Sequence, residues 1–181
     1  MADQEIDKLR FPIGEFSYSK NYSDGELNES ITDIENLSQI LKREVSSLDE
    51  EQLNTPYRDG GWTVKQVVHH LVDSHLNGYI RAKLVVTEDT PTIKPYDQDR
   101  WSELEEVELS DINESLKILE GLHKRWVTFL RTLKPEDFEK EYFHPEHGIS
   151  ISLKQSTCSY GWHCKHHMTH ITNLKKKMEW T

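Results

Sequence analysis

The chain has 181 residues, of which 35% are hydrophobic and 30% are charged, and its formal net charge is −10. This length predicts one domain over residues 1–181, and the short apolar stretches exclude a membrane span. The acidic charge argues against nucleic acid as a partner, because phosphates are bound by Lys and Arg. The N-terminus lacks an apolar signal segment and the two cysteines form no disulfide framework, so we expect a cytoplasmic protein.

Four segments carry apolar residues at the three- and four-residue spacing of an amphipathic helix. They span residues 24–48, 63–86, 110–133 and 153–178. The second follows the helix breaker Gly60-Gly61, and Thr63 and Gln66 at its start have the spacing of a capping box. The third ends before Pro135, which cannot continue a helix. Four long helices predict an all-α four-helix bundle.

The segment between the second and third helices, residues 87–109, contains Pro91 and Pro95 and several charged residues. It is longer than most connections between helices. Long ordered loops in compact domains are often functional. We therefore expect this segment to form a lid or a wall of a site.

Ten histidines are the most unusual feature of the composition. On the last helix, His163 and His167 form one pair four residues apart, and His166 and His170 form another, so each pair shares a helix face. The apolar arc of this helix contains His163 and His167, whereas His170 lies at its flank and His166 near its edge. Buried imidazoles need partners for their nitrogens, and one divalent ion bound by both is favoured over packing of two core histidines.

A third ligand is expected from the second helix, which offers His69, His70 and His75. The apolar periodicity of this helix places His75 well inside the bundle, His70 at the margin and His69 on the outward face. From periodicity alone, His75 would be the third ligand and His70 the second choice.

Three stretches of sequence carry a resemblance to a known family. They are TPYRDGGWTVKQVVHHLVDSH at residues 55–75, the segment 79–104 and WHCKHHMTHI at residues 162–171. The chain resembles the YfiT branch of the DinB-like superfamily of small metal-binding four-helix proteins over nearly its whole length. That family has a Trp at a helix start, a His eight residues later and His-x-x-x-His on the last helix. Trp62, His70, His163 and His167 match this pattern.

The resemblance implies that His70, His163 and His167 hold one divalent metal ion per chain, most often zinc or nickel. It thereby overrides the preference of the periodicity for His75. It also implies an up-down-down-up bundle, in which residues 87–109 form the long crossover, and it implies a homodimer.

Three histidine ligands on zinc leave an open position for water or substrate. The YfiT branch therefore implies a metal-dependent hydrolase that acts on a small-molecule substrate. One alternative is a metal-dependent thiol S-transferase, which joins a low-molecular-weight thiol such as bacillithiol to small electrophiles. The other is a non-catalytic metal-binding module of a stress response, which would turn over no substrate.

Other residues are candidates for roles beside the metal. Asp73 is a candidate general base, although a solvent-facing acid or a partner of a ligand histidine is preferred. Arg58, Arg81 and Tyr96 are candidate substrate-binding residues, and a surface role explains each arginine equally well when it is considered alone. Cys164 follows His163 directly and should face about 100° away from it, so it is not expected to be a ligand.

Overall fold

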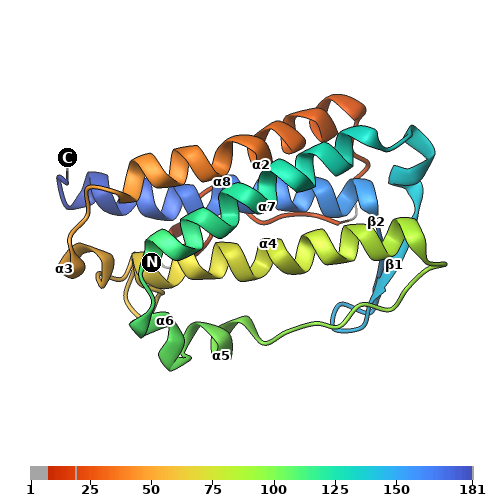
Figure 1. Cartoon of the computed structure of the whole chain (residues 1–181). Coiled ribbons are helices and arrows are strands. Elements are labelled where there is room, and N and C mark those ends of the chain that lie inside the picture. The colour runs from red at the N-terminus through yellow and green to blue at the C-terminus, as the bar shows by residue number, and fades with distance from the viewer. Residues whose placement is uncertain (1–7, 19, 181) are drawn as a thin grey trace.

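The structure is a computed structural model that describes residues 8–18 and 20–180. Its four long helices are α2 (Asp24–Val45), α4 (Val64–Thr87), α7 (Ile112–Thr132) and α8 (Leu153–Lys177). They lie side by side as a four-helix bundle (Figure 1), which confirms the predicted architecture. The largest difference from the predicted bounds is at α2, which ends at Val45 rather than at residue 48.

The helices have the up-down-down-up order. Along the chain, α2 and α8 run in one direction, and α4 and α7 run in the opposite direction (Figure 1). The parallel neighbours α4 and α7 are therefore joined by a segment that returns along the whole bundle. This crossover contains the short helices α5 (Gln98–Ser102) and α6 (Glu105–Leu109), and both contact α4.

Hydrogen bonds hold the crossover against the first turns of α4. Lys65 Nζ donates to the Glu108 carbonyl at 2.7 Å, and Gln66 Nε2 donates to the Ser102 carbonyl at 3.0 Å. Both donors are thereby satisfied although Lys65 is buried. The crossover thus covers one side of the first turns of α4.

The remaining elements are short. They are α3 (Glu50–Leu53), the 3-10 helix η1 (Pro135–Glu139) and an antiparallel hairpin of β1 (Glu141–His144) and β2 (Ile149–Ser152). Thr92 of the crossover forms an isolated bridge with Phe143 of β1. The sequence analysis did not predict this hairpin, because two four-residue strands carry too little alternation to separate them from a loop.

Reciprocal caps fix the starts of the two helices that carry most of the histidines. At α4 the Gln66 amide donates to Thr63 Oγ1 at 3.1 Å, and the Thr63 amide donates to Gln66 Oε1 at 2.9 Å, as the capping-box spacing predicted. Ser152 and Gln155 form the equivalent box at the start of α8. These caps set where each helix begins and thus which residues face the bundle interior.

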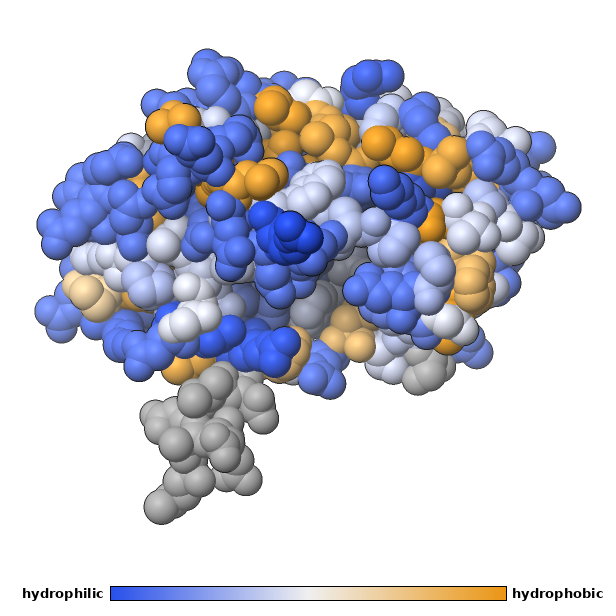
Figure 2. All heavy atoms as spheres, turned by 90° about the horizontal axis from the view of Figure 1, so that it is seen from below, coloured by the Kyte–Doolittle hydropathy of each residue, from blue (hydrophilic) through white to orange (hydrophobic). Residues whose placement is uncertain are grey.

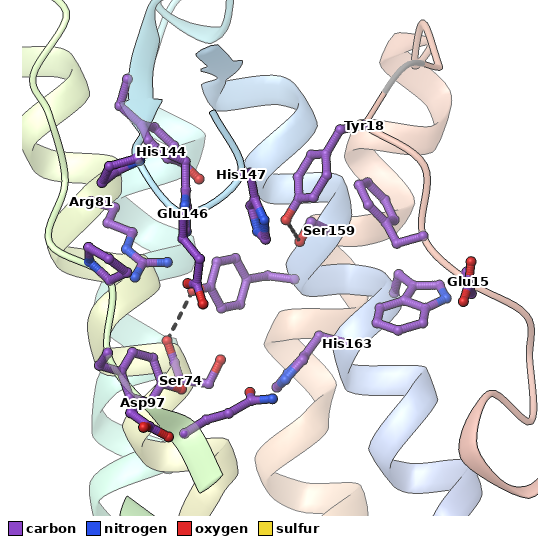
Figure 3. A pocket seen from close by; sticks show the side chains of 18 of the residues that line it. Glu15, Tyr18, Ser74, Arg81, Asp97, His144, Glu146, His147, Ser159 and His163 are labelled. Atoms are coloured by element: carbon purple, nitrogen blue, oxygen red, sulfur yellow. Dashed lines mark hydrogen bonds between the residues drawn. The ribbon is translucent and has the colours of Figure 1, made fainter. Parts of the chain in front are cut away.

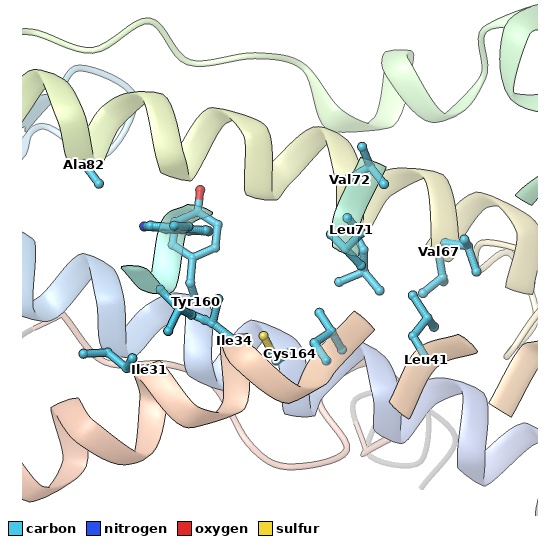
Figure 4. Close-up of a cluster of buried hydrophobic side chains, with 14 of the residues drawn as sticks. Ile31, Ile34, Leu41, Val67, Leu71, Val72, Ala82, Tyr160 and Cys164 are labelled. Carbon is cyan, nitrogen blue, oxygen red and sulfur yellow. The ribbon is translucent and has the colours of Figure 1, made fainter. Parts of the chain in front are cut away.

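The core lies between the long helices, where α2, α4 and α8 contribute apolar side chains such as Ile34, Leu71 and Tyr160 (Figure 4). Glycine allows α8 to approach α2 closely, because a Cβ on Gly161 would lie 2.5 Å from Ser30 Cβ. Cys164 is part of this core (Figure 4). The prediction that Cys164 points away from the paired histidines is consistent with this position.

Figure 2 shows the hydropathy of the side chains on one face of the molecule. Hydrophilic side chains cover most of this face, and apolar ones form smaller separate patches. In the described part of the chain, no helix is both long enough and apolar enough to cross a bilayer.

Candidate metal centre

The structure brings together three histidines from two antiparallel helices. His70 of α4 and His163 and His167 of α8 each direct one ring nitrogen to a common point, and these nitrogens all lie within 4.8 Å of one another. The Nε2 atoms of His70 and His163 are 3.1 Å apart. Two nitrogens that bind one tetrahedral zinc ion lie about 3.3 Å apart, so the spacing suits a shared ion.

Burial keeps these three rings neutral. Desolvation lowers the pKa of His70 to about 3, and it lowers the pKa values of His163 and His167 well below their ordinary value. Neighbouring histidines depress each pKa further, because a second positive charge nearby is unfavourable. Neutral imidazole has a free lone pair, which is the form that binds a metal ion.

Aromatic contacts hold the rings of the centre in place. The Trp62 ring lies 4.5 Å from the His70 ring and stacks on the His167 ring at 6.2 Å. Trp62 precedes Thr63, the N-cap of α4, so the same turn that starts the helix also packs against two of the three histidines.

A chain of hydrogen bonds extends from His163 into the core. His163 Nδ1 lies 3.2 Å from His75 Nε2, and His75 Nδ1 lies 2.8 Å from His123 Nε2. If His163 Nε2 binds an ion, its Nδ1–H must donate to His75, and His75 must then donate to His123. Such partners fix the tautomer and the ring orientation of a ligand histidine.

The two cysteines are poor candidate ligands. Neither Cys158 nor Cys164 belongs to a group of described residues that could hold an ion, and both are buried. Burial raises the pKa of Cys158 and raises that of Cys164 well above its ordinary value, which disfavours the thiolate that a metal requires. The donor set of three imidazoles therefore fits a divalent ion with an open position.

Two cavities meet at His163. The smaller, about 680 Å³, is lined by His70, His163 and His167, and the larger, about 1110 Å³, is lined by His163 and extends towards the hairpin. Figure 3 shows the larger cavity, with His144 and Arg81 at the end away from His163. Gln98 and Asp99 line both cavities, so the crossover forms part of their walls, as its length predicted.

Comparison with known proteins places this arrangement in a family. The DinB superfamily model matches residues 34–171. The chain belongs to the DinB superfamily. The structure of YfiT from Bacillus subtilis aligns with a TM-score of 0.92 and 45% identity, and the alignment covers 96% of this chain and 99% of YfiT. YfiT is described as "a probable metal-dependent hydrolase with an unusual four-helix bundle topology".

Relatives in the same superfamily match over nearly their full lengths. A protein of Oceanobacillus iheyensis is 50% identical over 171 residues, which cover 94% of this chain and 98% of that protein. A protein of Bacillus cereus strain 03BB102 is 48% identical over 175 residues, which cover 97% of this chain and all of that protein. Both carry the name "Putative metal-dependent hydrolase".

The other candidate residues lie in different places. Arg58 lines the smaller cavity, and Arg81 and Tyr96 line the larger one. Asp73 is half-buried and lines neither cavity. Burial and the nearby Glu106 raise the pKa of Asp73 to about 6, and its role as a general base stays a prediction.

Two histidines of α4 differ from what the apolar periodicity predicted, His69 in its burial and His75 in its role. His69 was expected on the outward face of α4, but it is buried and its Nδ1 lies 2.7 Å from Ser115 Oγ of α7. The expectation was wrong because the crossover and α7 cover that side of α4. His75 is fully buried, as predicted, but its nitrogens contact His163 and His123, and it lies outside the group of three that could hold an ion.

From the sequence, His144 and His147 were placed in a turn that could line the mouth of a site, although solvated positions were preferred for both; in the structure both line the larger cavity. His144 ends β1 and is buried, and its ring stacks on the exposed His147 ring at 4.1 Å. Burial lowers the pKa of His144 to about 4. The burial of His144 could not be predicted from the sequence, because His144 faces inward only through the hairpin, which the sequence did not predict.

Proposed function

We propose that this chain is a metal-dependent hydrolase of small molecules, with one Zn²⁺ or Ni²⁺ ion held by His70, His163 and His167. The observation that carries the proposal is the convergence of three neutral imidazoles, of which two are buried and one is half-buried, beside two cavities. Imidazole donors suit zinc and nickel. The names of the relatives and of YfiT support hydrolysis as the reaction.

His70, His163 and His167 would hold the ion, which would supply a position for water and would lower the pKa of that water towards neutral pH. The chain's own residues supply the surroundings. His75 and His123 orient the His163 ring through the hydrogen bonds described above. Tyr160 donates to the Ser74 carbonyl at 3.1 Å, so the wall between α4 and α8 is fixed next to the substrate cavity.

Arg81 is the candidate for substrate binding in the larger cavity. Its guanidinium donates to the Lys94 carbonyl at 3.4 Å. Among the described residues, its buried Nε has no hydrogen-bond partner and no carboxylate lies within 4.0 Å of the guanidinium. A guanidinium without an acidic partner is suited to bind a carboxylate or phosphate group of a ligand. Tyr96 lines the same cavity and offers an aromatic surface.

The unpaired guanidinium of Arg81 also supports a second candidate function, a thiol S-transferase. Both cysteines of the chain are buried thiols, so the nucleophile of such a reaction would come from a separate low-molecular-weight thiol. Arg81 could bind an acidic group of that thiol. The two reactions are distinguished by whether product formation requires an added thiol. A non-catalytic metal-binding module would bind the ion and form no product in either assay.

The proposal is tested on untagged protein purified without added metal and dialysed against a weak chelator. We expect one zinc or nickel ion per chain in the parent, and loss of that ion when His70, His163 or His167 is changed to Ala. His69→Ala is the matched control, because His69 is a buried neighbour that bonds Ser115 instead. A panel of esters and amides, with and without a thiol, then identifies the reaction.

The proposal fails if the parent binds no metal even after zinc is added, or if His163→Ala keeps its full metal content. A metal-replete parent that hydrolyses no member of the panel, but consumes an electrophile when a thiol is present, would favour the transferase.

We also propose that the chain forms a homodimer. Apolar side chains that remain exposed on the bundle and crossover support this, including Ile80 of α4, Leu109 of α6 and Ile118 of α7. Light scattering should give twice the chain mass of 21.3 kDa, whereas a mass of 21.3 kDa would contradict the dimer.

A further inference from the structure

A second group of histidine nitrogens lies next to the metal centre on α8. His166, His167 and His170 each offer a ring nitrogen, these nitrogens all lie within 4.8 Å of one another, and all three residues are buried. Among the described residues, the Nδ1 atom of each ring is buried and has no hydrogen-bond partner. Buried polar atoms are almost always paired, so three unpaired nitrogens on neighbouring rings indicate a partner outside the described residues.

The hydrogen bonds of His170 show what kind of partner its Nδ1 requires. His170 Nε2 lies 3.1 Å from the Arg10 carbonyl oxygen. A carbonyl oxygen only accepts, so Nε2 carries the proton and Nδ1 carries the lone pair. The unpaired nitrogen is therefore an acceptor, which a cation satisfies and a second carbonyl or carboxylate does not.

Stacking restrains two of these rings. Tyr57 stacks on the His170 ring at 4.0 Å, and Trp162 stacks on the His166 ring at 4.4 Å. The His166 and His170 rings lie 4.3 Å apart with their planes nearly perpendicular. Rings held by packing keep their nitrogens in place, which is what a binding site for an ion requires.

The surroundings allow a cation to enter. All three histidines line the 680 Å³ cavity, which also contains Arg10, Arg58, Asp99 and Glu103, so its two arginines are balanced by two carboxylates. A donor set of imidazole nitrogens selects zinc, nickel or similar ions over magnesium and calcium, which prefer oxygen.

We propose that His166, His167 and His170 form a second position for a divalent transition-metal ion, and that this position competes with the three-histidine centre for His167. A neutral imidazole has one lone pair, so His167 can bind one ion at a time. The ion would take the second position when the first centre is incomplete. The proposed competition for His167 depends on the proposed metal centre. The existence of the second group of nitrogens does not depend on that proposal.

The test is a zinc titration of untagged, metal-free protein followed by calorimetry at pH 7. The parent should bind one equivalent tightly. His163→Ala breaks the first centre and leaves the second group intact, so it should still bind one equivalent with at least 100-fold weaker affinity. The double variant H163A/H170A should show no saturable binding. H163A/H69A is the matched control and should bind as His163→Ala does.

Each other outcome has a defined meaning. If His163→Ala binds no zinc while the parent binds one equivalent, the second position is wrong and the first centre stands. Unchanged binding in H163A/H170A would also overturn the second position. Two equivalents in the parent would contradict the competition for His167, and none would overturn both sites. H70A and H70A/H170A repeat the comparison if His163→Ala lacks the helical circular dichroism of the parent.

Discussion

Two pairs of helices in the bundle bury different kinds of side chain. One pair is α2 and α7, and the other is α4 and α8. The buried side chains of α2 and α7 are apolar or small hydroxyl groups, apart from His123. The α4 and α8 helices bury six histidines, three on each helix, in addition to the half-buried His163. Burial of apolar side chains stabilises both pairs of helices, but α4 and α8 also bury polar rings, and desolvation of each ring costs free energy unless its nitrogens find partners.

The largest expected effect is acid unfolding of the metal-free chain. Burial lowers the pKa of His70 and His166 to about 3 and of His123 and His170 to about 4, against an ordinary value of 6.5. The unfolded chain therefore binds more protons below pH 6.5, and stability falls as the pH drops from 6.5 towards 4. Each such histidine contributes up to about 1.4 kcal/mol per pH unit.

This loss is measured by denaturant unfolding of the metal-free chain at a series of pH values. The free energy of unfolding should be nearly constant from pH 8 to 7 and should fall steeply below pH 6.5. A flat profile down to pH 4.5 would show that the histidine-rich helices do not bury neutral rings as described.

The second effect tests the apolar helices. Leu37 of α2 is almost fully buried, and Leu37→Ala should lower the free energy of unfolding by about 2–5 kcal/mol because it leaves a cavity. Zinc affinity of the folded chain should not change, since Leu37 lies in the apolar core and outside both histidine groups. Urea unfolding and calorimetry measure the two quantities, and a loss of zinc binding in a folded variant would contradict the separation of roles.

The smallest effect concerns a residue that supports the metal centre without belonging to it. His75→Gln removes the ring that accepts from His163, and zinc affinity should fall about 10–100-fold. Metal should still bind, in contrast to the His163→Ala variant after dialysis. Complete loss of zinc in a folded His75→Gln variant would instead assign His75 to the ligand set.

The sequence predicts the helices well because apolar periodicity records burial, but burial does not identify ligands. Periodicity ranked His75 above His70, and His75 is indeed the more deeply buried of the two. Its two nitrogens are nevertheless used by His163 and His123, whereas His70 points its Nε2 to that of His163. Which nitrogen faces which partner depends on ring orientation, and the spacing of residues along a helix does not encode it.

The walls of the cavities were less predictable than the histidine pairs. Tyr18, Arg81 and His144 come from three distant parts of the chain and meet at the larger cavity (Figure 3). Tyr18 comes from the segment before α2, Arg81 from α4 and His144 from the hairpin, whose four-residue strands have no clear pattern. By contrast, His163 and His167 are four residues apart on one helix, so their common face follows from local geometry.

Anomalous diffraction from crystals of the untagged protein grown with zinc would test the metal centre most directly. We predict one strong zinc peak at about 2.1 Å from a ring nitrogen of each of His70, His163 and His167. A peak that has His75 as a ligand, or a zinc-binding protein with no peak at these three rings, would contradict the proposed centre.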